Sequence, residues 1–132
     1  MIVVDSSALV AIVKAEPGWQ DLIAAIQGAP TAHLASINYV ETGIVLIRRG
    51  YFAEKSALDS WLRDIRIQVR EDTPLRDAAL TTYLRYGKGV HPAGLNLADC
   101  FAYALAASLN APLLFKGDDF SQTDIVSALH PT

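Results

Sequence analysis

The segment IVVDSSAL, residues 2–9, places three branched apolar residues directly before an aspartate and two serines. Consecutive branched apolar residues are typical of a strand that is buried on both faces, as in a parallel sheet. Asp5 and Ser6 can then cap a helix that we expect to run through about Lys14. The segment therefore predicts a strand followed by a helix, with a carboxylate at the carboxyl end of the strand.

The same alternation of strand and helix continues along the chain. Ser36 is expected to cap the helix after the second strand. Strands that alternate with helices pair in parallel, so the pattern predicts one α/β domain over residues 1–132, with a central, mostly parallel sheet flanked by helices. No element is assigned to the tail. The further strands are expected at 32–35, 67–69 and 112–115, and the further helices at 21–28, 37–50, 53–64, 74–86 and 97–110.

The composition excludes a disordered chain. Of 132 residues, 52% are hydrophobic and 19% are charged, which is typical of a compact globular protein. No apolar run approaches the ~18 to 20 residues of a membrane span, and Asp5 interrupts the apolar N-terminal segment. A single cysteine, Cys100, cannot form an internal disulfide. We therefore expect a cytoplasmic protein with no membrane partner.

Four carboxylates from distant segments are predicted to meet at one edge of the sheet. Functional groups collect at the carboxyl ends of parallel strands, where the following helices also begin. Asp5 and Asp118 follow the first and last strands, and Glu41 and Asp99 lie in early turns of helices. Each has a plain structural alternative: a cap for Asp5, a capping box with Asn96 for Asp99, a solvated face for Glu41 and a turn for Asp118. Their joint placement on one edge favours a shared site.

Carboxylates that share a site repel one another and lose hydration unless a cation binds between them. Hard oxygen ligands favour Mg²⁺ or Mn²⁺ over zinc, and the histidines, His33, His91 and His130, show no ligand spacing. A divalent ion held by carboxylates can activate water and neutralise charge on a phosphodiester. The pattern therefore favours metal-dependent hydrolysis of phosphodiesters.

Four ordered segments resemble PIN-domain ribonucleases, and most closely the toxin half of VapBC-type toxin–antitoxin pairs. They are IVVDSSAL, SINYVET around Glu41, YGKGVHPAGLNLADCFAYALA around Asp99, and PLLFKGDDFSQTDI. The resemblance covers essentially the whole chain. It implies a metal-dependent endoribonuclease that forms a homodimer and is held inactive by a small antitoxin. It also implies that Asp5 and Asp99 are the core magnesium ligands and that Glu41 and Asp118 complete the acidic site.

One position departs from the family pattern. Many PIN domains have Ser or Thr just before the last acid, whereas this chain has Gly117. This leaves open whether Asp118 or Asp119 faces the metal, with Asp118 favoured. It also leaves open whether the hydroxyl of Ser6 or that of Ser7 orients water.

The formal net charge of −3 argues against a nucleic-acid binder, since such domains are usually basic. RNA affinity, however, depends on local phosphate contacts more than on net charge. Each cation near the site has the alternative of being an ordinary solvated surface charge, least so for the lysine that adjoins the last acids. The cations that could border the cleft are Lys14, Arg48, Arg49, Arg85, Lys88 and Lys116.

The acids do not fit two other enzyme classes. Phosphotransferases of the haloacid dehalogenase type need a second aspartate at the position of Ser7, and receiver domains need a paired acid where Asp5 stands alone. A PIN domain that processes RNA without being a toxin, or that binds RNA or protein without cutting, stays open. Metal-dependent cleavage of RNA separates a catalytic domain from a binding module.

Overall fold

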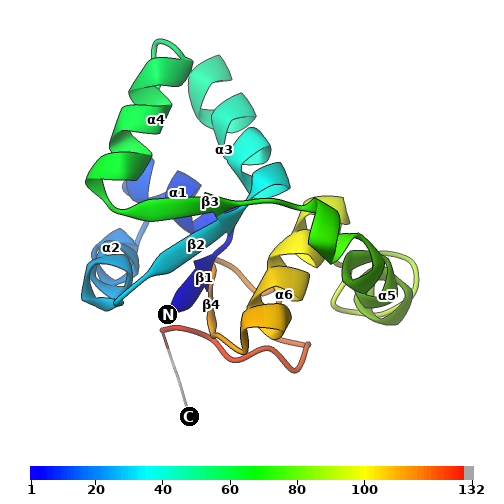
Figure 1. Cartoon of the computed structure of the whole chain (residues 1–132). Coiled ribbons are helices and arrows are strands. Elements are labelled where there is room, and N and C mark those ends of the chain that lie inside the picture. Colours follow the sequence, from blue (N-terminus) through cyan, green and yellow to red (C-terminus); the bar gives the residue numbers. More distant parts are fainter. Residues whose placement is uncertain (130–132) are drawn as a thin grey trace.

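Four short strands form one sheet at the centre of the molecule (Figure 1). The computed structural model describes residues 1–129; His130 lies outside them. The strands are β1 (Ile2–Val4), β2 (Ala32–Ala35), β3 (Ile67–Arg70) and β4 (Leu113–Leu114). Their order is β3-β2-β1-β4, and every neighbouring pair is parallel. The predicted α/β fold with a parallel sheet is thus confirmed.

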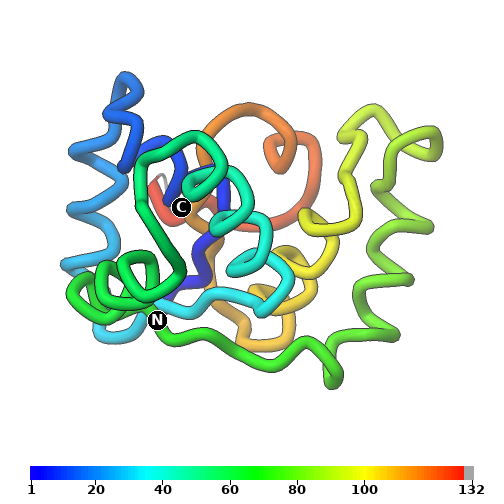
Figure 2. The backbone as a smooth tube through the Cα atoms, turned by 90° about the horizontal axis from the view of Figure 1, so that it is seen from above, coloured from blue at the N-terminus to red at the C-terminus, as the bar shows by residue number. Residues whose placement is uncertain are grey.

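Helices cover both faces of this sheet because its strands are apolar at successive positions. Val3 and Leu113 pack into a core with α5 and α6, whereas Val4 and Leu114 pack with α1, α2 and α4. In Figure 2, α2 and α5 stand at opposite ends of the molecule. The helices are α1 (Ser6–Val13), α2 (Trp19–Gly28), α3 (Ser36–Arg48), α4 (Lys55–Asp64), α5 (Arg76–Tyr86) and α6 (Leu97–Leu109), with a 3₁₀ turn at Thr73–Leu75 before α5.

The start of α3 corrects a sequence prediction. Ser36 does not cap the helix: it is the first helical residue, and its hydroxyl donates to the carbonyl of Arg70 at 2.7 Å. The cap is the carboxylate of Asp72, which accepts the backbone N–H groups of Ser36 (2.9 Å) and Ile37 (2.7 Å). Because β3 lies beside β2, the chain leaving β3 reaches the start of α3 and satisfies two of its free N–H groups.

The start of α6 follows the prediction. Asn96 Oδ1 accepts the backbone N–H of Asp99 at 2.8 Å, and Asp99 Oδ2 accepts the N–H of Asn96 at 3.0 Å. The two residues form a capping box at the N-terminus of the helix.

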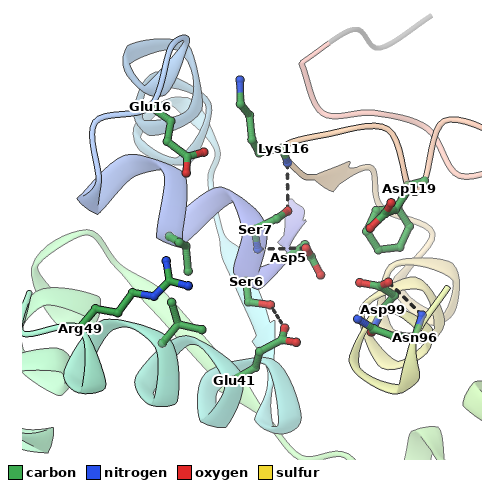
Figure 3. Close-up of a pocket in the computed structure, with 13 residues that line it drawn as sticks. Asp5, Ser6, Ser7, Glu16, Glu41, Arg49, Asn96, Asp99, Lys116 and Asp119 are labelled. Atoms are coloured by element: carbon green, nitrogen blue, oxygen red, sulfur yellow. Dashed lines mark hydrogen bonds between the residues drawn. The ribbon is translucent and has the colours of Figure 1, made fainter. Parts of the chain in front are cut away.

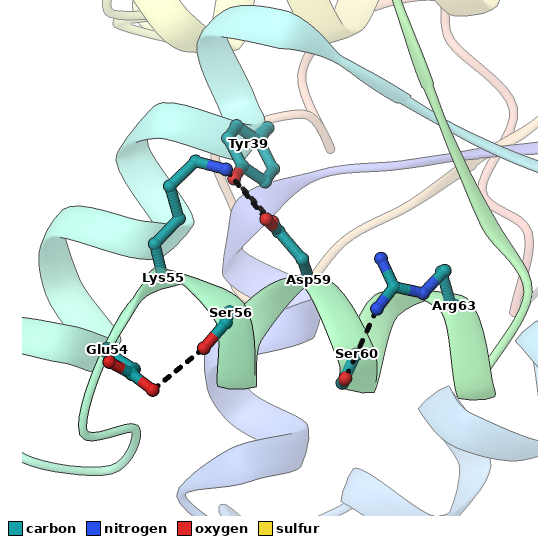
Figure 4. A network of polar contacts seen from close by, with 7 residues as sticks. All are labelled: Tyr39, Glu54, Lys55, Ser56, Asp59, Ser60 and Arg63. Atoms are coloured by element: carbon teal, nitrogen blue, oxygen red, sulfur yellow. Dashed lines mark hydrogen bonds and ion pairs between the residues drawn. The ribbon is translucent and has the colours of Figure 1, made fainter.

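A polar network fastens α3 to α4 (Figure 4). The hydroxyl of Tyr39 on α3 donates to Asp59 on α4 at 2.5 Å, and Lys55 Nζ donates to the same carboxylate at 2.7 Å. The rings of Phe52, after α3, and Trp61, on α4, lie 5.7 Å apart. These contacts fix the outer side of the helix that carries Glu41.

The segment after β4 returns along the outer edge of that strand. The N–H of Leu113 donates to the carbonyl of Val126 at 2.8 Å, and the N–H of Ala128 donates to the carbonyl of Leu113 at 2.9 Å. Earlier in the same segment, Asp124 accepts the hydroxyl of Tyr103. The described part of the tail, to which the sequence assigned no element, is therefore bonded to the sheet and to α6.

None of the helices within residues 1–129 has the length and apolar character needed to cross a membrane.

Candidate functional site

A cleft of about 380 Å³ opens at the carboxyl edge of the sheet (Figure 3). Its walls come from the turn between β1 and α1, from α3, from the start of α6 and from the loop after β4. The carboxylates that line it are Asp5, Glu16, Glu41, Asp99 and Asp119. Three of the four acids predicted from the sequence therefore share one cleft.

Asp5 directly follows β1 as the N-cap of α1 and is the most buried of these acids, with 3% of its surface exposed. Its Oδ2 accepts the N–H of Ser7 at 3.0 Å, while its buried Oδ1 has no hydrogen-bond partner in the described part of the chain. Burial raises the pKa of Asp5 to about 7; the bonds from Ser7 oppose the shift, and the charges of Asp99 and Glu41 add to it. A buried carboxylate oxygen without a partner carries a desolvation cost that a bound cation would relieve.

Asp99 lies at the start of α6 across the cleft from Ser6 and Glu41 (Figure 3). Burial raises the pKa of Asp99 to about 6; the N–H of Asn96 opposes the shift, and the charges of Asp119 and Glu41 add to it. The capping box is thus more than a helix start: the carboxylate that closes it also faces three other acids.

Glu41 is held from the opposite wall. Its carboxylate accepts the hydroxyl of Ser6 from α1, and the amide of Asn38, one turn earlier on α3, donates to the carbonyl of Ala98 at 3.2 Å. These two bonds join α3 to α1 and to the start of α6. The second serine, Ser7, accepts the backbone N–H of Lys116 at 3.0 Å. Both serines are part of the cleft, and which of them orients water stays a prediction.

The loop after β4 places Asp119, and not Asp118, in the cleft. Gly117 turns the chain with a φ of +99°, a conformation that favours glycine. The carbonyl of Asp118 then accepts the N–H and the hydroxyl of Ser121, and the residue borders a different hollow, between the loop after β4 and the segment that follows it. The sequence favoured Asp118 because a strand predicts which edge a loop reaches, but not which of two successive residues in an irregular turn points inward.

Glu16 lines the cleft without having been predicted. It follows α1 in the turn toward α2, and Lys14 pairs with it at 3.3 Å. No spacing or motif marks this position in the sequence, because the turn that brings it to the cleft is irregular.

The donor set fits a hard divalent cation in its chemistry. The lining acids offer oxygen ligands only, as Mg²⁺ and Mn²⁺ prefer, and the unpartnered Oδ1 of Asp5 lies among them. Within residues 1–129, no group of three or more His, Cys, Asp or Glu side chains is positioned to coordinate a metal ion in the present conformation. Binding would therefore draw the carboxylates closer together.

The PIN domain family model matches residues 2–126. Ribonuclease VapC of Mycolicibacterium smegmatis is 46% identical over 132 residues, covering 98% of this chain and 100% of the relative. Ribonuclease VapC30 of Mycobacterium tuberculosis is 41% identical over 133 residues, with 98% and 100% covered.

Two solved structures share the fold. The Mycobacterium tuberculosis toxin VapC20, described as cleaving the sarcin-ricin loop, superposes with a TM-score of 0.76 at 18% identity, covering 96% of this chain and 97% of that one. A chain of a toxin–antitoxin complex from Klebsiella pneumoniae gives a TM-score of 0.71 at 12% identity, with both chains covered completely. At these identities the likeness concerns the fold alone.

Proposed function

The chain belongs to the PIN-domain family, and from that premise we propose that it is a divalent-metal-dependent endoribonuclease, the toxin of a VapBC-type toxin–antitoxin pair. The observation that carries the proposal is the cleft in which Asp5, Glu41, Asp99 and Asp119 come together at the carboxyl edge of the sheet. The curated relatives named ribonuclease VapC, at 41% to 46% identity over nearly the whole chain, support the same activity. We take the PIN domain to extend over residues 1–132.

Asp5 and Asp99 would hold Mg²⁺ or Mn²⁺, with Glu41 and Asp119 completing the site. When bound, the ion supplies an activated water and neutralises charge on the phosphodiester. Asp118, which the sequence favoured, is left out of this set because it borders another hollow.

The backbone orients the carboxylates of Asp5 and Asp99 in the same way. Asp5 and Asp99 each have one oxygen bound to a backbone N–H, from Ser7 and from Asn96 respectively. The second oxygen of each has no hydrogen bond within residues 1–129. Each carboxylate is thus oriented through one oxygen, while its other oxygen is available to bind a cation.

We further propose that an antitoxin protein silences the enzyme in the cytoplasm and that the toxin is a homodimer. An apolar groove beside the cleft supports a protein partner: Val40 and Ile44 on α3 and Leu97 on α6 are exposed along it. Exposed apolar surface that adjoins a site is typical of an interaction surface.

The test is cleavage of cellular RNA by the purified protein, with Mg²⁺ or Mn²⁺ and then with chelator, followed by mapping of the cut ends. We expect cleavage only with the ion, and little cleavage by Asp5→Asn, in which the amide still accepts the Ser7 N–H but is a poor ligand for a hard cation. Cleavage that is indifferent to chelator or to Asp5→Asn would contradict the proposal.

Two further measurements refine it. Asp119→Asn should weaken metal binding about tenfold, and Asp118→Asn should leave it near the parent value; the reverse order would return Asp118 to the site. Expression of the protein alone should arrest growth, and co-expression of the adjacent small gene product should relieve the arrest. Normal growth with an active nuclease would indicate RNA processing rather than a toxin.

A further inference from the structure

The cleft that holds the acids is basic at its other end. Arg49 and Lys116 line it together with the carboxylates. Figure 3 shows Arg49 on the side away from Asp99 and Asn96, with its guanidinium turned inward. The cleft is therefore polarised, with negative charge at one end and positive charge at the other.

The residue spacing along α3 gives the distance between the acidic and basic ends of the cleft. Glu41, Val45 and Arg49 all line the cleft, and they follow one another at intervals of four residues. Residues four apart lie on the same face of a helix, and eight residues span about 12 Å at 1.5 Å per residue. On the facing helix α1, Ser6 and Val10 line the cleft with the same interval. An apolar middle thus separates the acids from Arg49.

Six cations were predicted from the sequence to border the cleft, and the structure places two of them there. Of the six, only Arg49 and Lys116 line the cleft. Lys14 forms an ion pair with Glu16 at 3.3 Å, and its positive charge offsets the negative charge of Glu16 at the basic end. Arg85 is paired with Asp124 at 3.6 Å on another side of the molecule.

Both remaining charges are uncompensated. Across residues 1–129, Arg49 forms no ion pair. Lys116 Nζ donates to the backbone carbonyl of Pro17 at 2.7 Å, which fixes the ammonium in place without neutralising it. The backbone of Lys116 is itself held by Ser7, the neighbour of the serine that bonds Glu41. The position of this cation is thus fixed relative to the acidic end.

We propose that Arg49 and Lys116 form a phosphate-binding subsite, which takes a phosphate of the RNA strand beyond the bond that is cleaved. The inference rests on the proposed function, because it assumes that the acidic end handles the scissile phosphate. A neighbouring phosphate would be repelled by the carboxylates, whereas a guanidinium and an ammonium bind phosphate through charge-assisted hydrogen bonds. The separation of about 12 Å selects a polyanion that extends along the cleft over a single phosphate group.

The experiment measures binding apart from cleavage. In the full-length Asp5→Asn background with chelator, the dissociation constant of a short labelled single-stranded oligoribonucleotide is determined at several salt concentrations. Arg49→Gln should weaken binding about tenfold and reduce the slope of log K against log salt by about 0.7, the value for one phosphate contact on a single strand. Lys116→Gln should act in the same direction.

The matched control is Arg48→Gln, which removes the same charge from the adjacent exposed residue that does not line the cleft. It should leave binding within about twofold of the background, since an exposed charge off the binding path is screened by salt. Equal effects of Arg48→Gln and Arg49→Gln would overturn the subsite. So would weakened binding of polyglutamate with unchanged binding of RNA, which would assign the two cations to a protein partner.

Cleavage kinetics separate this proposal from the proposed function. In the otherwise unaltered enzyme with Mg²⁺ or Mn²⁺, Arg49→Gln should raise KM about tenfold and change kcat little, because a contact away from the reacting bond binds ground state and transition state alike. A fall in kcat with unchanged KM would overturn the subsite. Absence of metal-dependent cleavage by the parent would overturn the proposed function, whereas the subsite is decided by the binding comparison.

Discussion

Helices α3 and α6 bring Glu41 and Asp99 to the same cleft, but they begin in different ways. α6 is capped by its own neighbours, since Asn96 and Asp99 exchange hydrogen bonds across three residues. α3 is capped by Asp72, which lies 36 residues downstream of Ser36. A helix start made of neighbours can be recognised in a sequence, whereas one made by a distant strand exists only once the sheet has formed. The two walls of the cleft therefore depend on the fold to different degrees.

The largest expected effect is on RNA cleavage, and it tests whether the acids on α3 and α6 contribute equally to catalysis. Asp99→Asn and Glu41→Gln should each lower RNA cleavage by several orders of magnitude, because an amide is a poor ligand for a hard cation. The asparagine still offers an oxygen to the Asn96 N–H, so the start of α6 stays capped. Cleavage rates with saturating Mg²⁺ and a thermal melt of each variant provide the measurement.

Near-normal cleavage by either folded variant would remove that acid from the site. Comparable losses in both would show that the two walls contribute equally to the chemistry, however differently their helices begin.

The next effect concerns stability and bears on the comparison directly. Asp72→Ala should lower the free energy of unfolding by about 2 kcal/mol, the upper part of the range for a lost N-cap, because two N–H groups lose their acceptor together. Asn96→Ala, which removes one acceptor, should cost about 1 kcal/mol. Urea unfolding monitored by circular dichroism measures both.

Asp77→Ala is the control for that pair. Asp77 is exposed, and its ion pair within residues 1–129 is with the exposed Arg76 at 3.6 Å, so its loss should change stability by less than about 0.5 kcal/mol. A larger cost for Asn96→Ala than for Asp72→Ala would show that the local cap, and not the distant one, is the stronger of the two.

A third prediction is that removing the negative charge at the two helix starts changes the stability of the metal-free protein in opposite directions. The pKa of Asp99 is raised to about 6 from an ordinary value of 3.8, so between these values the folded form binds more protons than the unfolded form. Stability in chelator should therefore fall as pH rises through this window. At neutral pH, Asp99→Asn should raise the melting temperature by a few degrees, whereas Asp72→Asn should lower it.

Asp5 adds to the same trend, because its raised pKa of about 7 extends the window upward. Melting temperatures of the parent and the two variants, measured from about pH 4 to pH 7.5 in chelator, decide the question. A parent protein whose stability rises steadily with pH over this range would contradict the raised pKa values of Asp5 and Asp99, which burial causes in the main and the neighbouring acids increase.

The smallest effect tests the residue that the sequence suggested as the cap. Ser36→Ala removes only a hydrogen bond to the carbonyl of Arg70, so it should cost about 1 kcal/mol or less and leave cleavage unchanged. A loss equal to that of Asp72→Ala in the same urea assay would restore Ser36 as the cap.

The parts of the molecule that sequence reasoning recovered are those encoded by neighbours. The apolar run at β1 and the alternation of strands with helices predicted the parallel sheet, and its carboxyl edge predicted that Asp5, Glu41 and Asp99 lie together. The capping box at Asn96 was recovered for the same reason.

What could not be recovered depends on irregular backbone or on distant contacts. Asp119 faces the cleft because of the left-handed turn at Gly117, and Glu16 reaches it through the turn after α1. The cap by Asp72 requires β3 to lie beside β2. The sequence singled out Lys116, which adjoins the last acids, but it could not select Arg49 over Lys14 and Arg85, because the pairing of those two with acids is a property of the folded chain.

The bonds that Leu113 makes with Val126 and Ala128 have a consequence for self-association. β4 ends the sheet, and a bare outer strand offers unpaired N–H and C=O groups on which another chain can pair. The returning segment occupies those groups at Leu113. A protein shortened before residue 125 would keep every acid of the cleft but present an open strand to its neighbours. We expect such a truncation to aggregate, and loss of activity in it would report on that aggregation rather than on the chemistry of the cleft.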